Sequence, residues 1–177
     1  MFDEKELISQ CLAGNRVAEK QLFDTYSSCF LGICMRYADS RAEAEDMLIT
    51  GFTRIFKNLD SYDGSGSFFG WMKSVIIHNA VDWTRQRSDW EYIDDQPSSQ
   101  RTFSTKMSHA FDCEEIVMAI RKLPIQYRDI FNLYVVEGFA HKEIAKMLGM
   151  NEHTVRVYYS KAKRRLQELL KDYRKDG

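Results

Sequence analysis

Hydrophobic residues recur along this chain at intervals of three and four positions, the spacing at which side chains share one face of a helix. Residues that start helices precede these patterns, as Asp3, Asn15 and Ser40 do in the first half. Glycine is scarce, and proline occurs only at Pro97 and Pro124. The pattern therefore predicts an all-α chain.

The first three predicted helices each follow a capping residue. A short helix starts at Asp3 and ends near Gly14, and a second follows Asn15. Ser40 with Glu43 forms a capping box for the third. Both longer helices have an apolar face that must be buried. The apolar face of the second helix comprises Ala18, Leu22, Phe23, Tyr26, Phe30 and Ile33, and that of the third comprises Met47, Leu48, Gly51, Phe52, Ile55, Phe56 and Leu59.

A segment rich in glycine and serine, from Ser61 to Phe68, interrupts the helical pattern and is predicted to be a mobile loop. A fourth helix is predicted over about 69–87. Its packing residues are Trp71, Met72, Val75, Ile76, Ala80 and Trp83, and its polar residues include His78, Asn79, Asp82, Arg85 and Arg87. Amide, imidazole and guanidinium groups beside aromatic rings suit stacking on exposed nucleotide bases and hydrogen bonding to them. An ordinary polar helix face explains the same residues equally well.

A polar stretch without periodicity, 88–111, follows this helix. We interpret it as a flexible linker between two small helical domains, 1–87 and 112–177. The first helix of the second domain starts at Asp112, and Pro124 is expected at the first helical position of the next. The residues predicted to be buried by these two helices are Ile116, Val117, Ile120, Ile130, Phe131 and Tyr134.

Two further helical patterns, between His141 and Leu170, are separated only by Gly149, Met150 and Asn151. The apolar face of the first comprises Ile144, Ala145 and Leu148, and that of the second comprises Val155, Tyr159, Ala162 and Leu166. Basic residues of the second pattern lie mostly off its apolar face. A short helix, a tight turn and a basic second helix predict a helix-turn-helix that binds DNA. The alternative is an ordinary helical hairpin with a solvated basic face.

The formal net charge of −1 would by itself argue against a nucleic-acid partner. The charge is unevenly distributed, however. From Glu114 to Gly177 there are 13 basic and 9 acidic side chains, a net charge of +4, whereas Met1 to Asp60 has 7 basic and 10 acidic ones, a net charge of −3. A basic second domain and an acidic first domain suggest two partners of different kinds.

The four cysteines form no CxxC pair and have no histidine at zinc-finger spacing. We therefore expect no metal site, no disulfide framework and no cofactor. The N-terminus lacks the basic start and apolar core of a signal peptide, and no apolar run is long enough to insert into a membrane. These features predict a soluble, cytoplasmic protein.

Three segments together resemble an extracytoplasmic-function (group IV) sigma factor of the sigma-70 family. They are AEAEDMLITGFTRIFKNL, FFGWMKSVIIHNAVDWTRQR and LPIQYRDIFNLYVVEGFAHKEIAKMLGMNEHTVRVYYSKAKRRL, and they occur in the order of that family. The resemblance implies a promoter-specificity subunit that is not an enzyme. It also implies that the chain binds core RNA polymerase and promoter DNA and that an anti-sigma factor regulates it.

The resemblance assigns residues to three surfaces. Domain 2 of the family corresponds to 1–87 and domain 4 to 112–177. The implied polymerase-binding residues are Asp46, Leu48, Ile49, Phe52, Ile55 and Phe56. The implied contacts to the −10 element are Tyr62, Phe68, Trp71, His78, Asn79, Asp82 and Arg85. The predicted contacts to the −35 element are Glu152, His153, Thr154, Arg156, Val157, Ser160, Lys161 and Arg164.

Two departures from the family bear on DNA sequence preference. The family usually has asparagine seven residues after Trp71, where this chain has His78 followed by Asn79. Either of the two could therefore contact a −10 base. In the second helix of the helix-turn-helix, Val157 and Tyr158 replace a common Ser-Arg pair, so the preferred −35 sequence is expected to differ.

Two other classes of protein were weighed against the sigma factor. One is a stand-alone helix-turn-helix regulator whose first domain senses a ligand or a partner. The first domain, however, offers only helices and no phosphoacceptor on a strand. The other is a hydrolase that uses His78 with Asp82, or the cysteines, but no nucleophile-base pattern or phosphate loop supports it.

Overall fold

The computed structural model describes residues 4–87 and 113–173 of the chain, and all regular structure within them is helical. The chain divides into two compact units, an N-terminal unit (Met1–Thr84) and a C-terminal unit (Arg85–Gly177). The prediction of two helical regions is thereby confirmed. The predicted linker, 88–111, lies outside the described residues, so the exact domain boundaries stay a prediction.

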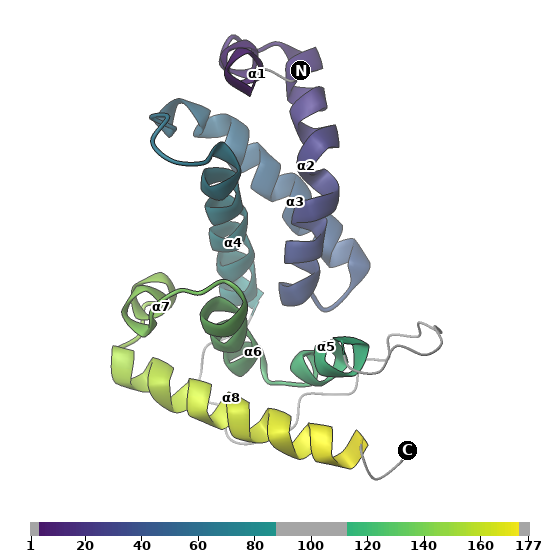
Figure 1. The fold of residues 1–177 in the computed structure, drawn as a ribbon, viewed down its shortest axis with the longest axis vertical. Helices are drawn as coiled ribbons and strands as arrows, with labels where there is room; N and C mark the ends of the chain where they lie inside the picture. Colours follow the sequence, from purple (N-terminus) through teal and green to yellow (C-terminus); the bar gives the residue numbers. More distant parts are fainter. Residues whose placement is uncertain (1–3, 88–112, 174–177) are drawn as a thin grey trace. The chain divides into compact units, whose positions relative to one another are not determined.

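The helices of the N-terminal unit lie close to their predicted bounds (Figure 1). They are α1 (Glu4–Leu12), α2 (Arg16–Tyr37), α3 (Arg41–Lys57), the short 3₁₀ helix η1 (Leu59–Ser61) and α4 (Phe68–Arg87). The predicted cap Asp3 lies outside the described residues. None of the described helices is long and apolar enough to cross a membrane.

Two predicted caps fix where α2 and α3 begin. The Asn15 side chain accepts hydrogen bonds from the backbone N–H groups of Val17 (3.0 Å) and Ala18 (3.4 Å). Ser40 Oγ accepts one from the N–H of Glu43 (3.1 Å). The Glu43 carboxylate accepts from the N–H of Asp39 (2.7 Å), one residue before the cap. The helix starts therefore follow from local sequence.

An aromatic cluster fills the core between α2, α3 and the start of α4. Phe30 is fully buried, and its ring lies 5.4 Å from that of Phe69 and 5.9 Å from that of Phe52. Phe23 packs on Phe52 at 4.7 Å. Most residues of the predicted apolar faces of α2 and α3 are buried, but Phe23, Tyr26 and Phe56 are only half-buried. Phe69 was not among the predicted packing residues.

Gly51 is where α3 and α4 approach most tightly. A Cβ atom at this position would lie only 2.5 Å from Cδ1 of Ile76, closer than real Cβ contacts occur. Gly51 thus lets the two helices come close together because it has no Cβ atom. Any larger side chain here would have to displace Ile76, which is fully buried.

The C-terminal unit contains five helical elements in its described part. They are α5 (Cys113–Arg121), α6 (Ile125–Phe131), the π-helical turn η2 (Asn132–Val136), α7 (His141–Leu148) and α8 (Glu152–Tyr173). α8 packs against α5, α6 and α7. One cluster in its core comprises Ala119, Leu123, Tyr127, Ala162 and Leu166.

Two sequence predictions for α5 and α6 need correction. Ile116 and Val117 are 43% and 45% exposed, because α5 turns Ala119 rather than these residues into the core. Pro124 is the N-cap of α6 and not its first helical residue. After α6 the backbone changes to π geometry at Asn132, and Leu133 in this turn lies in the core.

The cysteines of the N-terminal unit differ in exposure, which predicts selective labelling. Burial raises the pKa of the Cys34 thiol to about 12, and Cys11 is buried as well. Cys29 is exposed. In a Cys113→Ser background at pH 8, a thiol reagent should modify Cys29 rapidly and Cys34 only after unfolding, because the thiolate is the nucleophile. Equal labelling of Cys29 and Cys34 in the folded protein, measured by peptide mass spectrometry, would contradict this packing.

Candidate functional site

The helix-turn-helix has the predicted turn. Gly149 is left-handed, with φ of 64°, and the N–H of Met150 donates to the carbonyl of Ala145 (2.9 Å). The Asn151 side chain then accepts hydrogen bonds from the N–H (2.7 Å) and Oγ1 (2.9 Å) of Thr154. Asn151 therefore caps the first turn of α8, and the Thr154 hydroxyl helps to hold the Asn151 side chain in place.

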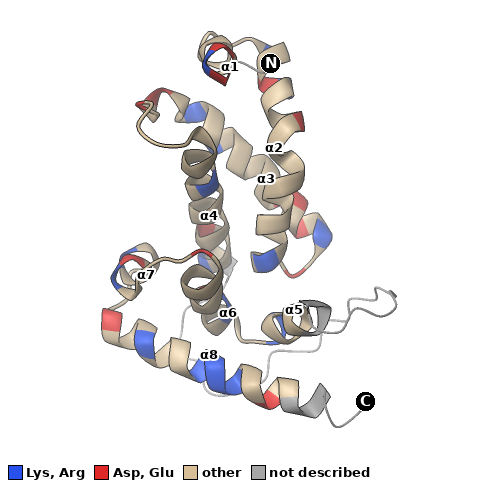
Figure 2. Ribbon diagram, viewed as in Figure 1, with Lys and Arg blue, Asp and Glu red and all other residues tan. Residues whose placement is uncertain are grey.

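α8 separates an apolar face from a basic one. Val155 and Ala162 are fully buried, and Tyr158 packs its ring 5.3 Å from that of Tyr127. Lysine and arginine gather along the rest of α8 (Figure 2). Of the predicted −35 residues, His153, Arg156, Ser160 and Arg164 are exposed, and Glu152, Thr154, Val157 and Lys161 are half-buried. All eight therefore lie off the buried stripe.

Arg156 is ion-paired within its own helix. Its Nη2 lies 2.6 Å from Oε1 of Glu152, one turn earlier, and the two side chains are 64% and 40% exposed. Such an exposed pair contributes little to stability. Its main effect is to hold the guanidinium near the N-terminal end of α8.

A ring cluster that the sequence analysis missed holds this motif together. His141, at the start of α7, stacks on Tyr134 of η2 at 4.2 Å, and Tyr159 of α8 lies 4.6 Å from Tyr134. Three elements are joined by these rings. The only sequence signal was the predicted burial of Tyr134 and Tyr159, because nothing local shows that rings from three helices will meet.

The loop between η1 and α4 is held by its own side chains. Tyr62 donates a hydrogen bond to the carbonyl of Gly66 (3.0 Å), and the Asp63 carboxylate accepts from the N–H (2.8 Å) and hydroxyl (2.6 Å) of Ser65. These bonds hold the pKa of Asp63 below its ordinary value. Gly64 and Gly66 have positive φ angles, which favour glycine. The predicted loop thus has a defined conformation.

Three aromatic rings line the junction of this loop with α4. Phe68 and Trp71 are stacked at 5.9 Å, and Tyr62 lies 5.1 Å from Phe68. Phe68 is only 1% exposed, whereas Tyr62 and Trp71 are half-buried. Only Tyr62 and Trp71 therefore present part of a ring at the surface, and Phe68 supports them from below.

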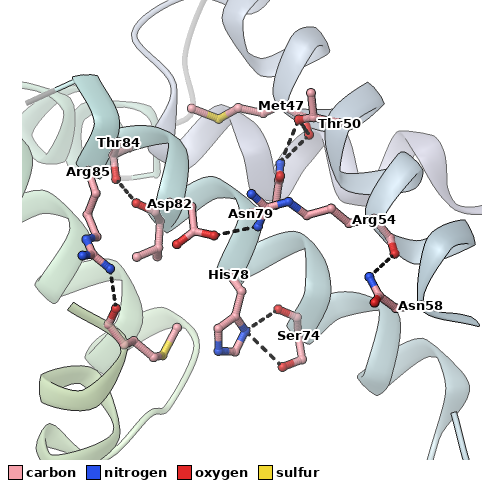
Figure 3. A network of polar contacts seen from close by, with 12 residues as sticks. Met47, Thr50, Arg54, Asn58, Ser74, His78, Asn79, Asp82, Thr84 and Arg85 are labelled. Carbon is pink, nitrogen blue, oxygen red and sulfur yellow. Dashed lines mark hydrogen bonds and ion pairs between the residues drawn. The ribbon is translucent and has the colours of Figure 1, made fainter. Parts of the chain in front are cut away.

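The side chains of His78 and Asn79 project from α4 in different directions (Figure 3). Asn79 is 2% exposed, and its amide donates hydrogen bonds to the carbonyl of Met47 (2.9 Å) and to Oγ1 of Thr50 (3.0 Å). His78 is exposed. Of the two residues left open by the sequence, Asn79 is engaged in the contact with α3, and only His78 has an exposed side chain.

Two more polar contacts connect α4 to α3. Arg54 Nη1 lies 2.6 Å from the Asp82 carboxylate (Figure 3), and Trp83 donates to Oε1 of Glu43 (3.1 Å). Asp82 therefore carries a charge that Arg54 partly offsets, and Arg85 is exposed. Sequence reasoning missed the roles of Arg54 and Thr50, since pairing between two helices has no local signature.

The predicted polymerase-binding residues divide by exposure. Ile49 is 58% exposed, Asp46 is exposed and Phe56 is half-buried. The other three, Leu48, Phe52 and Ile55, are at most 6% exposed and belong to the core of the unit. Their burial corrects the prediction that all six form one contact surface, because buried side chains shape this surface without reaching it.

Two family models match the chain. The model described as Sigma-70 region 2 matches residues 22–89, and that described as Sigma-70, region 4 matches residues 113–166. Together they account for most of the sequence, and their order is that of the two helical units. The chain belongs to the sigma-70 family. It is an RNA polymerase sigma factor of the extracytoplasmic-function type, a transcription initiation factor and not an enzyme.

Known sigma factors are similar over nearly the full length. ECF RNA polymerase sigma factor SigW of Bacillus subtilis is 23% identical over 181 residues, covering 95% of this chain and 97% of the relative. SigX of the same organism is 24% identical, covering 85% and 84%. The sigma factor RpoE from Bartonella quintana, solved in complex with the anti-sigma factor NepR, has the same fold, with a TM-score of 0.58, 20% identity and coverage of 86% of this chain and 96% of that chain.

Proposed function

We propose that this sigma factor binds core RNA polymerase and the −10 element through the N-terminal unit and the −35 element through α8. The observation that carries the proposal is the division of α8 into a buried stripe and an exposed face whose lysines and arginines begin at Arg156, in the second turn of the helix. Such a helix can enter the major groove while its other face stays packed on its own domain.

In the −35 contact, the first turns of α8 face base edges and later cations hold phosphates. Arg156 is exposed beside His153, and both lie in the first two turns. A guanidinium can donate two hydrogen bonds to the O6 and N7 atoms of guanine. Lys161 and Arg164 lie farther along the helix and supply charge that does not depend on sequence.

Arg156→Ala should weaken binding to the preferred −35 sequence by about 1–3 kcal/mol and relax base preference at one position. Lys161→Ala should instead weaken binding to all sequences by a similar factor and reduce the salt dependence of binding. Binding of the complex with core polymerase to specific and scrambled −35 fragments, at several salt concentrations, measures both effects. If Arg156→Ala lost equal affinity for the specific and the scrambled fragment, Arg156 would contact the DNA backbone and not a base.

In the −10 contact, we propose that the half-exposed rings of Tyr62 and Trp71 stack on an unpaired base. Phe68 supports these rings, and His78, Asp82 and Arg85 contact neighbouring DNA. Extruding a base costs a few kcal/mol, so the site must recover that energy by stacking and by hydrogen bonds. The internally bonded loop supports this role, because a preorganised site loses less entropy on binding.

Core polymerase is proposed to bind the exposed surface of α3 around Asp46, Ile49 and Phe56. An isoleucine that is 58% exposed next to a carboxylate matches an apolar contact with a charged rim. Ile49→Glu should weaken capture of core polymerase, whereas Val17→Glu, the same kind of change at a position of α2 that is 76% exposed, should leave it unchanged. If the Ile49 variant captured core polymerase as well as wild type in a pull-down, the polymerase contact would have to lie on another surface.

We also propose that an anti-sigma factor binds this chain and that it acts in the cytoplasm, where polymerase is found. The similar sigma factor RpoE from Bartonella quintana was solved in complex with the anti-sigma factor NepR. Co-expression with candidate proteins encoded beside this chain, followed by size-exclusion chromatography and transcription assays, tests the proposal. Unaltered transcription with every candidate would oppose it.

A further inference from the structure

We infer that His78 is a specificity residue for the −10 element and that it presents a hydrogen-bond acceptor, so that its partner is the exocyclic amine of adenine or cytosine. The inference rests on the proposed contact between α4 and promoter DNA. Beyond that contact, it specifies which residue selects a base and which chemical group of the residue does so.

The first observation is the partner of the imidazole. Nδ1 of His78 lies 2.7 Å from the backbone carbonyl oxygen of Ser74, one turn earlier, and 3.5 Å from Oγ of the same residue (Figure 3). A carbonyl oxygen can only accept a hydrogen bond, so Nδ1 carries the hydrogen. In the neutral ring this leaves Nε2 as an acceptor. The carbonyl therefore selects the tautomer.

The second observation is the orientation of the ring. The hydrogen bonds of His78 to other described residues use Nδ1 alone, and the side chain is exposed. The next residue, Asn79, is tied to Met47 and Thr50 of α3 by two hydrogen bonds. These bonds fix the rotation of α4 about its axis, so His78 and its Nε2 atom face outward on the side away from this contact.

We place His78 on the part of the −10 element beside the extruded base that is still paired. There the only donors on major-groove base edges are the N6 amine of adenine and the N4 amine of cytosine. A neutral imidazole whose Nδ1 donates to the Ser74 carbonyl can therefore hydrogen-bond to these bases through Nε2 but not to guanine O6 or thymine O4. An asparagine at this position would carry both a donor and an acceptor, so a histidine held as an acceptor allows fewer bases than an asparagine would.

The test uses the full chain with core polymerase. A randomised −10 library, transcribed with wild type and with His78→Ala, should identify one position whose preference depends on His78. At that position, the adenine or cytosine that His78 contacts is replaced by purine or 2-pyrimidinone, which lack the exocyclic amine. Promoter binding by wild type should fall about fivefold, the value of one hydrogen bond. Promoter binding by His78→Ala should fall only by the amount that the weaker pairing of the modified base causes.

Two controls separate the possible outcomes. Ser74→Ala keeps the backbone carbonyl and should retain the amine dependence. At an adenine, the 7-deaza analogue keeps the amine but removes the N7 acceptor, and wild type should tolerate it. Sensitivity to 7-deaza substitution without sensitivity to loss of the amine would show a donor imidazole and overturn the inference.

The same assay distinguishes this inference from the function on which it rests. If transcription depends on core polymerase and on Arg156 but no −10 position depends on His78, only the role of His78 is wrong. If no transcription depends on core polymerase, the proposed function itself fails. His78 is exposed, so its replacement by alanine should leave the thermal unfolding midpoint unchanged.

Discussion

Phe30→Ala is expected to lower the free energy of unfolding of the N-terminal unit by about 3–5 kcal/mol. Phe30 is fully buried and in ring contact with Phe69 and Phe52. Truncation removes these contacts and leaves a cavity that the packed helices cannot fully close. Denaturant unfolding of the full chain, followed by the fluorescence of Trp71 and Trp83 in a Trp90→Phe background, measures the change.

The matched control is Val17→Ala on the same helix. Val17 is 76% exposed, so this truncation should change the free energy of unfolding by no more than about 0.5 kcal/mol. A loss below about 1 kcal/mol for Phe30→Ala would mean that the aromatic cluster is not the core of this unit.

Asn79→Asp should destabilise the same unit by about 3 kcal/mol at pH 8. The substitution keeps the size of the side chain but removes both N–H donors and places a buried carboxylate against the carbonyl oxygen of Met47. Burial and this oxygen both disfavour the charged form, so the introduced carboxyl should have a raised pKa. Its neutral form can still donate to Met47.

A carboxyl whose pKa is raised by folding favours the folded state at low pH, and this advantage is lost as the pH rises through the raised pKa. The deficit of Asn79→Asp relative to wild type should therefore be smaller at pH 5 than at pH 8. Unfolding curves at the two pH values measure it, with His78→Ala as the neighbouring control. A deficit that does not change with pH would contradict the buried contact.

Local sequence predicted most of the helix boundaries. Asn15, Ser40 and Asn151 act as caps because a short polar side chain can satisfy backbone N–H groups within two or three residues. Gly149 ends α7 because it adopts the left-handed conformation at low cost. These interactions involve only neighbours in the chain, so the sequence contains the information needed to predict them.

Pairing between helices could not be predicted in the same way. Asn79 lies between apolar residues on a helix that is packed on more than one side, so periodicity did not show which face it would join. Its partners, Met47 and Thr50, are about 30 residues earlier in the chain. The exposure of Ile116 and Val117 has the same cause, because the rotation of α5 depends on α8, which packs against it.

The candidate site was predicted in outline but not in detail. The basic face of α8 and the position of the loop followed from composition and turn residues. Periodicity placed Leu48, Phe52 and Ile55 on the buried face of α3, whereas the family resemblance grouped them with exposed residues as polymerase contacts, because a resemblance carries no information on burial. It also did not reveal that Ser74 orients the imidazole of His78.

Transcription from a promoter library randomised at both elements, with purified chain and core RNA polymerase, tests whether this chain selects promoters for the polymerase. We expect initiation only when both proteins are present, with selected −10 and −35 elements and with preference relaxed at one −35 position for Arg156→Ala. Sequence-specific DNA binding by the chain alone, without initiation when core polymerase is added, would contradict this expectation and would indicate a stand-alone helix-turn-helix regulator.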